Sequence, residues 1–328
     1  MINPALEKKF FNKTILVTGG AGFIGSNLAK YLSQFECRLI IIDNLNPKCG
    51  GTLDNLQDIN KDRYIFHKCN LITCKHLERY IAETDYIFNL AGIVDHIESI
   101  NNPSLDLKMN VLPHIHLLEI CRYTNPNIKI VFTSTRGVYG KNKNKPLENT
   151  ASSPIDINGI HKSTAEQYHL LYTKLYSIQT CCLRLTNTYG PRHQAKHPGH
   201  GIINWWIKQI FSKKTITVYK PGTQIRDINY VDDVVKALIL SMVYPTTDGK
   251  IYNLGGSTIS LLELARLIKK ISGHGIIDLK IFPKNSEKID VGNYIANYNA
   301  IQKDTKWSPQ TSLEDGIRTT IDYYVSSR

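Results

Sequence analysis

The sequence predicts an α/β protein built on a doubly wound parallel sheet, with a smaller C-terminal α/β lobe that depends on it. Apolar, β-branched runs alternate with helix-length segments in the first half of the chain, a glycine-rich turn follows the first run, and the pattern loosens after residue 183. Strands that alternate with helices form βαβ units, which cover both faces of a parallel sheet. We therefore expect a first domain over residues 1–182 and a lobe over 183–328, with segments at about 225–256 returning to the first domain.

Five apolar runs are predicted to be the strands of the first domain. Each run is short and rich in isoleucine, valine or phenylalanine, which is typical of strands buried on both faces. The runs are residues 14–18, 38–43, 64–67, 86–90 and 128–132.

Helical patterns fill most of the remaining chain. Two long helices are predicted at about 105–123 and 158–176, and each carries an apolar stripe with three- and four-residue steps. Residues 192–201 are polar and rich in histidine, so we expect an exposed loop there. The shorter elements are helices at 26–35, 231–244, 261–272 and 313–324, an amphipathic segment at 202–211 and a strand at 215–219.

The composition excludes several classes of protein. The 328 residues are 42% hydrophobic and 21% charged, which is enough apolar material for a core and unlike a disordered or fibrous chain. No apolar run approaches the roughly 18–20 residues that a membrane span needs. Residues 1–11 also lack the apolar stretch of a signal peptide. We therefore expect a soluble cytoplasmic protein with no membrane partner.

The charge bears on the partners. Lysine and arginine number 40 against 28 acidic residues, which gives a net charge of +12. The lysines are scattered and have no interleaved aromatic residues, so we expect an anionic small molecule rather than nucleic acid.

Seven cysteines without a C-x-x-C pair predict reduced thiols. His193, His197 and His200 lie in a loop without acidic or thiol neighbours, so we predict no metal site.

The turn after the first strand has the pattern of a dinucleotide site. Gly19 allows a tight turn, Gly22 lets the backbone approach a pyrophosphate, and Gly25 lets helix and strand pack closely. Asp43, at the end of the second strand, is placed to accept hydrogen bonds from the adenosine ribose and to repel a 2′-phosphate. NAD is therefore favoured over NADP. A second small-residue turn, 89–92, belongs to the same sheet edge.

Further motifs extend over nearly the whole chain. They are Asn110, the run 132–135 followed by 138–140, Lys162, and the segments 184–192, 224–233, 252–256 and 307–309. Together with the two turns, these residues resemble the extended short-chain dehydrogenase/reductase family, in particular its NAD-dependent nucleotide-sugar epimerases and dehydratases.

The resemblance implies a Rossmann-type domain that holds NAD, a lobe that holds a nucleoside-diphosphate sugar, and a homodimer formed through the two long helices. It assigns the cofactor to residues at the strand ends, and the substrate to hydroxyl, amide and guanidinium groups. The expected cofactor residues are Gly19, Gly22, Phe23, Ile24, Gly25, Asp43, Asn44, Asn70, Leu71, Leu90, Ala91, Gly92 and Lys162. The expected substrate residues are Thr135, Arg136, Asn187, Arg192 and Arg226, the last as the ligand of the diphosphate.

The sequence departs from the family at the catalytic position. The family's base is a tyrosine four residues before the lysine, and here that residue is Asn158, with the spacing to Lys162 intact. An amide has no ionisable form near neutral pH, so another group must accept the proton. The candidates are His161, Tyr139, Lys162 itself, and the loop residues Asp95, His96 and Glu98. Thr135 matches the hydroxyl that orients the sugar.

A second departure narrows the reaction. In the family's 4,6-dehydratases, an aspartate and a glutamate follow the threonine and eliminate water, whereas here Arg136 and Gly137 follow Thr135. The sequence therefore favours a nucleotide-sugar epimerase that acts at C4 through transient oxidation. The alternatives are a dehydratase or oxidoreductase of the same family, and a catalytically weakened protein that binds NAD and nucleotide sugars.

Overall fold

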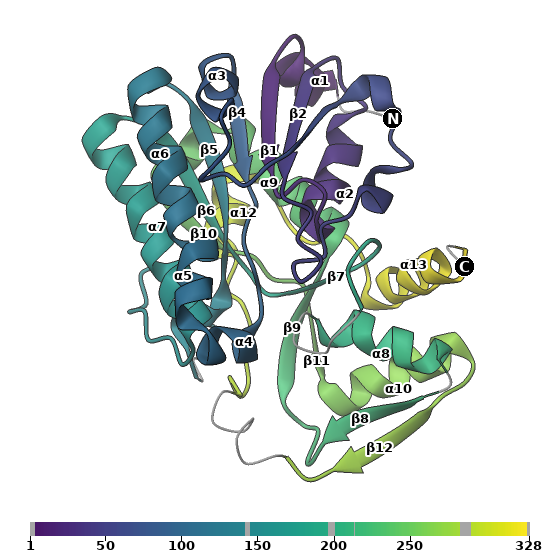
Figure 1. The fold of residues 1–328 in the computed structure, drawn as a ribbon. Helices are drawn as coiled ribbons and strands as arrows, with labels where there is room; N and C mark the ends of the chain where they lie inside the picture. The colour runs from purple at the N-terminus through teal and green to yellow at the C-terminus, as the bar shows by residue number, and fades with distance from the viewer. Residues whose placement is uncertain (1–3, 142–144, 196–200, 213, 283–289, 327–328) are drawn as a thin grey trace.

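The computed structural model describes residues 4–141, 145–195, 201–212, 214–282 and 290–326. Its larger part is a seven-stranded, fully parallel sheet in the order β10-β6-β5-β4-β1-β2-β3 (Figure 1). The order reverses between β1 and β4, as in doubly wound folds, so the predicted fold class is confirmed. The strands are β1 (Thr14–Thr18), β2 (Arg38–Asp43), β3 (Ile65–Lys68), β4 (Tyr86–Asn89), β5 (Lys129–Thr135), β6 (Gln179–Leu185) and β10 (Lys250–Asn253).

Helices cover both faces of this sheet because alternate strand residues point to opposite sides. On β1, Ile15 and Val17 belong to one apolar cluster and Leu16 to another. The first cluster lies under α2 (Phe23–Leu32) and α9 (Val231–Val243). The second lies under α3 (Leu77–Ala82), α6 (Leu112–Thr124) and α7 (Ile157–Tyr176). Short helices α1 (Pro4–Phe10) and α12 (Asn299–Thr305) complete the larger part.

The prediction of a single helix over 105–123 is wrong, because the structure has two helices there. The helix α5 (Pro103–Asn110) ends before Val111, and α6 starts at Leu112. Pro113 explains the break, since its ring clashes with the carbonyl one turn back and it has no N–H to donate.

The lobe lies at the lower right of Figure 1 and has its own apolar core. A three-stranded sheet and a two-stranded sheet pack there against three helices. The strands are β7 (Asn187–Tyr189), β9 (Ile225–Tyr230) and β11 (Ser257–Ser260), then β8 (Thr215–Tyr219) and β12 (Ile276–Lys280). The helices are α8 (Ile202–Phe211), α10 (Leu261–Ser272) and α13 (Leu313–Ser326). The structure has α8 and β8 at the predicted positions.

The chain passes between the two parts more than once. Residue 182, the predicted end of the first domain, falls inside β6, which continues to Leu185. After β9, the chain returns through α9 and β10 to the large sheet, and it then goes back to the lobe through β11. The division into domains therefore stays a prediction, while the structure shows an interleaved chain.

Two findings concern the chain as a whole. Within the described ranges, no helix is both long and apolar enough to cross a membrane. All seven cysteines are free thiols, of which Cys121, Cys181 and Cys182 are buried and the other four are partly exposed.

Candidate active site

A cleft of about 620 Å³ runs along the carboxyl ends of the sheet strands and against the lobe. Parallel strands bring their carboxyl ends to one edge, so side chains far apart in sequence meet there. Most of the residues predicted from the sequence line this cleft. They are Gly19, Gly22, Phe23, Ile24, Gly25, Asp43, Asn44, Asn70, Leu71, Leu90, Ala91, Gly92, Thr135, Arg136, Lys162, Asn187 and Arg226.

The glycine turn is shaped by contacts that exclude a side chain. Gly19 has φ +68°, and a Cβ there would lie 2.9 Å from the Leu90 carbonyl oxygen. A Cβ on Gly25 would lie 2.2 Å from the Gly19 carbonyl oxygen. Gly22 is the N-cap of α2, so the free N–H groups of the helix begin at this turn. The turn therefore has a shape that lets its backbone N–H groups approach a pyrophosphate closely.

Asp43 connects the glycine turn to the loop after β2. Its carboxylate accepts the N–H of Ala21 at 3.0 Å and the N–H of Leu45 at 2.8 Å. Burial raises the pKa of Asp43 above its usual value. The side chain also lines the cleft at the end of β2, which is where a carboxylate would meet the adenosine ribose.

Lys162 is a buried cation at the other end of the sheet edge. Its Nζ donates to the Thr133 carbonyl at 3.1 Å and lies 4.9 Å from the centre of the Phe132 ring. Burial lowers its pKa to about 8, and Asp106 and Glu166 oppose that shift. Because a Cβ on Gly92 would lie 3.2 Å from Nζ, the glycine leaves this ammonium accessible to the cleft.

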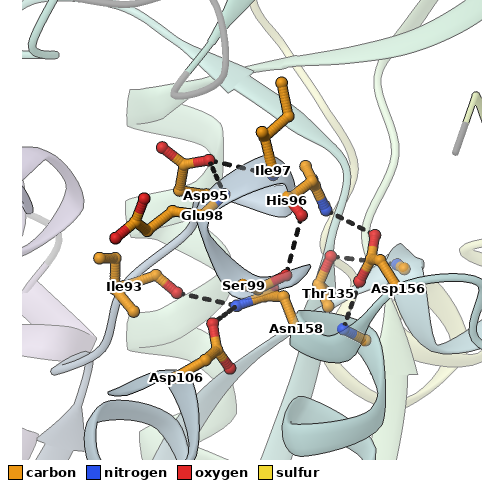
Figure 2. A network of polar contacts seen from close by, with 12 residues as sticks. Ile93, Asp95, His96, Ile97, Glu98, Ser99, Asp106, Thr135, Asp156 and Asn158 are labelled. Carbon is orange, nitrogen blue, oxygen red and sulfur yellow. Dashed lines mark hydrogen bonds and ion pairs between the residues drawn. The ribbon is translucent and has the colours of Figure 1, made fainter. Parts of the chain in front are cut away.

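Asn158, which occupies the position of the family's tyrosine, is completely buried and hydrogen-bonds neighbouring segments of the chain. Its Nδ2 donates to the Ile93 carbonyl at 2.9 Å and to Asp106 Oδ2 at 3.2 Å (Figure 2). The Ile93 carbonyl also accepts from Asn110 at 3.0 Å. Asn158 thus fixes the chain that follows β4, and it is not among the residues that line the cleft.

Two of the predicted replacements for the tyrosine are also held outside the cleft lining. His161 Nδ1 lies 2.6 Å from Asp106 Oδ1, in the same buried group as Asn158. The Tyr139 hydroxyl donates to Asn253 Oδ1 at 2.7 Å and accepts from Arg184 at 2.6 Å. Burial raises the pKa of Tyr139, which makes its phenolate harder to form.

The loop residues that were candidates for the base differ in their placement. Asp95 is the N-cap of α4 (His96–Asn101), where its carboxylate accepts the N–H groups of Ile97 and Glu98. The sequence had indicated a loop over this short helix. His96 lines the cleft, and its Nδ1 lies 2.7 Å from Asp156 Oδ2 (Figure 2). Asp156 also lines the cleft and was not predicted, although an aspartate just before an apolar helix is a recognisable N-cap signal.

Arginines line the lobe side of the cleft. Arg226 Nη2 lies 2.6 Å from Asp290 Oδ1, and a second nitrogen donates to the Gly292 carbonyl. Arg136 lies 5.2 Å over the ring of Tyr294 and, among the described residues, has no ion-pair partner. Burial and the nearby Arg226 lower the pKa of Arg136 to about 10, so it remains a cation at neutral pH.

The other predicted substrate residues differ in placement. Asn187 lines the cleft and donates to the Asp227 carbonyl at 2.8 Å. Arg192 instead holds Asn27 of α2 at 2.8 Å and Asp58, and it does not line the cleft. His193 is described, whereas His197 and His200 lie outside the described residues. In the described parts, no group of three His, Cys, Asp or Glu side chains is arranged to hold a metal.

The fold and the cleft define a dinucleotide-binding α/β enzyme. The chain belongs to the NAD-dependent epimerase/dehydratase family, whose model matches residues 15–255, and NAD is its cofactor. The chain is 33% identical to the uncharacterized UDP-glucose epimerase YtcB of Bacillus subtilis, over 95% of this chain and 98% of that protein. It is 28% identical to CDP-paratose 2-epimerase of Salmonella typhi, over 95% and 99%.

Solved structures of nucleotide-sugar epimerases are also similar to this chain. The UDP-glucose 4-epimerase of Thermotoga maritima, in complex with UDP-glucose, superposes with a TM-score of 0.85 at 29% identity, over 96% of this chain and 99% of that one. The UDP-glucuronic acid 4-epimerase of Bacillus cereus, in complex with UDP-glucuronic acid and NAD, gives 0.85 at 25% identity, over 96% and 100%. The chain is therefore an enzyme of a family that acts on nucleotide sugars.

Proposed function

We propose that this protein is an NAD-dependent nucleotide-sugar epimerase that inverts C4 of a nucleoside-diphosphate sugar. The observation that carries the proposal is the convergence of Lys162, Thr135 and the pair Arg136 and Arg226 in one cleft beside the glycine turn. When bound, NAD removes a hydride from the sugar carbon and later returns it.

In this proposal, different residues hold the cofactor, bind the diphosphate and orient the sugar. The glycine turn and Asp43 hold the adenosine half of the cofactor, and Lys162 holds the nicotinamide ribose. Arg226 binds the diphosphate, since its planar fork matches two phosphate oxygens. Thr135 orients the sugar hydroxyl; its Oγ1 accepts the N–H of Gly137 at 3.0 Å, which fixes the side chain and leaves its O–H free to donate.

Arg136 and Gly137 favour epimerisation over dehydration. Neither residue can serve as the acid or base that eliminates water, and Arg136 is a half-buried cation that lines the cleft. Such a cation favours a substrate with a carboxylate or phosphate near the sugar ring. The competing proposal, a binding protein with weakened catalysis, is favoured by Asn158, because its amide is occupied by two acceptors and cannot replace the tyrosine.

Turnover of a panel of nucleotide sugars tests these proposals. We expect one of a set of UDP-, CDP-, GDP- and dTDP-linked hexoses and hexuronates to be converted to its C4 epimer in deuterated water without uptake of deuterium on carbon. Proton NMR measures both outcomes. Deuterium on carbon would favour elimination or enolisation, and binding without turnover of any sugar would favour the binding protein.

We also propose a homodimer through α5, α6 and α7. These helices carry exposed apolar side chains that a monomer would leave in water: Leu107, Leu112, Tyr123, Ile160, Leu171 and Leu175. Light scattering is expected to give twice the chain mass of 37.2 kDa for the wild type. The double variant Leu171→Glu, Leu175→Glu should give the chain mass, whereas Leu53→Glu, on an exposed residue outside these helices, should leave the mass unchanged. An unaltered mass in the double variant would place the interface elsewhere.

A further inference from the structure

The cleft contains one histidine that is held by a buried carboxylate and has a free ring nitrogen. His96 Nδ1 lies 2.7 Å from Asp156 Oδ2, and the histidine side chain is 36% exposed while that of Asp156 is 4% exposed. Among the described residues, no hydrogen-bond partner is found for His96 Nε2. Both side chains line the cleft together with Thr135 and Lys162. Figure 2 shows His96 and Asp156 facing each other beside Thr135.

Asp156 is suited to orient the histidine ring. Its Oδ1 accepts the N–H of Gly159 at 2.7 Å, which caps α7 and fixes the carboxylate. The hydrogen bond with His96 and the nearby Arg136 hold the pKa of Asp156 below its usual value, despite burial. An ionised carboxylate at Nδ1 keeps the proton of a neutral imidazole on that nitrogen. Nε2 is then the basic nitrogen.

Asn158 connects this pair to the missing tyrosine. Its amide holds the Ile93 carbonyl, three residues before His96, and Asp106 joins Asn158 to His161. Asp95 then caps α4 directly before His96. The residue that replaces the tyrosine therefore helps to fix the short segment that carries the histidine.

We propose that His96 Nε2, oriented by Asp156, accepts the proton of the sugar hydroxyl in place of the family's tyrosine. This inference rests on the proposed epimerase function. In the oxidation step the hydroxyl O–H bond breaks and an N–H bond forms at Nε2. The electron pair left on oxygen forms the carbonyl as the hydride leaves the same carbon for oxidised NAD. The imidazolium, stabilised by Asp156, returns the proton when the carbonyl is reduced, so atoms and charge balance over the cycle.

Other groups near His96 serve less well as the base. Lys162 is the strongest alternative, but its ammonium already donates to the Thr133 carbonyl and is charged below a pH of about 8. The elements α5 and α7 pack against α4. The charged groups nearby are Asp106, Asp156, His161, Arg136 of the 3-10 turn η3 (Arg136–Tyr139), Glu98 on α4 itself with Asp95 as its cap, and Lys48, whose Nζ lies 3.9 Å from Glu98 Oε1.

The test uses the substrate that the NMR panel identifies. His96→Gln is expected to lower kcat by about 10²–10⁴-fold, the usual loss for a general base. Its affinity for UDP or the matching nucleoside diphosphate, measured by calorimetry, should stay within about threefold, because Arg226 is untouched. The acid limb of the wild-type kcat/KM profile should disappear in His96→Gln. Asp156→Asn should lower kcat as well and leave the nucleoside-diphosphate affinity unchanged, because the carboxylate that orients the His96 ring at 2.7 Å is lost.

Chemical rescue separates a base from a structural residue. Free imidazole is expected to raise the rate of His96→Ala in proportion to its concentration and to leave the wild type unchanged. His76→Ala, on an exposed histidine outside the cleft, is the matched control and should retain the wild-type rate. The inference is overturned if His96→Gln keeps kcat within about threefold, or if the loss comes without rescue and without a changed acid limb. If the wild type converts no sugar in the panel, the epimerase proposal fails together with this one.

Discussion

Lys162→Met is expected to lower turnover while it raises the stability of the fold at pH 7. Lys162 is a cation at the cleft that has one acceptor among the described residues, the Thr133 carbonyl, so its remaining N–H groups are available to the bound ligands. Removing a preorganised donor of this kind typically costs about 10²–10³-fold in kcat. The loss should appear both in steady-state turnover and in the single-turnover absorbance of the reduced cofactor.

The stability gain follows from the direction of the pKa shift. Burial lowers the pKa of Lys162 from 10.5 to about 8, so at pH 7 the folded protein carries a charge that the interior disfavours. Between about pH 8 and pH 10.5 the unfolded chain binds more protons than the folded one, so the free energy of unfolding rises with pH in that window. The shift corresponds to about 3 kcal/mol, as an order of magnitude.

Urea unfolding at pH 7 and at pH 9.5 measures this effect. The wild type should gain stability relative to Lys162→Met as the pH rises, and the variant should be the more stable of the two at pH 7. Lys174→Met, on an exposed residue of the same helix, should change neither turnover nor the pH dependence. A variant that is less stable than the wild type at pH 7 would show that the contacts of Lys162 outweigh the cost of its burial.

The fold was predictable because its signals are local. The glycine turn, Asp43 and the apolar runs for β1 to β5 each depend on neighbouring residues, and the structure has strands at all five positions. The strand β6 was not predicted, because Thr180 is its one β-branched residue and two cysteines, Cys181 and Cys182, follow it. Its burial next to the edge strand comes from pairing with β5 and β10, which local sequence does not encode.

The site was predictable only in part, for a similar reason. Residues of the strand-end turns follow directly from strand positions, and most of them line the cleft. The pairing of His96 with Asp156 joins side chains 60 residues apart, and the sequence places no constraint on their distance. Asn158 likewise could be recognised as a departure, but its role as a tie to Ile93 depends on how the chain after β4 folds back.

Arg184→Met is expected to cause the largest loss of stability of any single substitution considered. Arg184 on β6 meets Glu166 on α7 through two nitrogens, at 2.9 Å and 2.7 Å, and the two side chains are 4% and 0% exposed. A third nitrogen donates to the Tyr139 hydroxyl at 2.6 Å and to the Glu148 carbonyl at 3.0 Å. The variant leaves the Glu166 carboxylate buried without its partner, which costs about 3–5 kcal/mol.

The double variant Arg184→Met, Glu166→Leu identifies the cause of that loss. Because an apolar pair of similar volume is often as stable as a buried ion pair, the second change should recover most of the stability that the first removes. Arg38→Met is the matched exposed control: Arg38 and Glu83 lie 2.7 Å apart but are 46% and 41% exposed, so the urea midpoint should stay unchanged. If the double variant is no more stable than Arg184→Met, the loss comes from the contacts with Tyr139 and Glu148 and not from the unpaired charge. The same ion pair fastens α7 to the sheet, and α7 carries Lys162 and is capped at its N-terminus by Asp156. Arg184→Met should therefore also lower turnover, and the double variant should restore turnover together with stability.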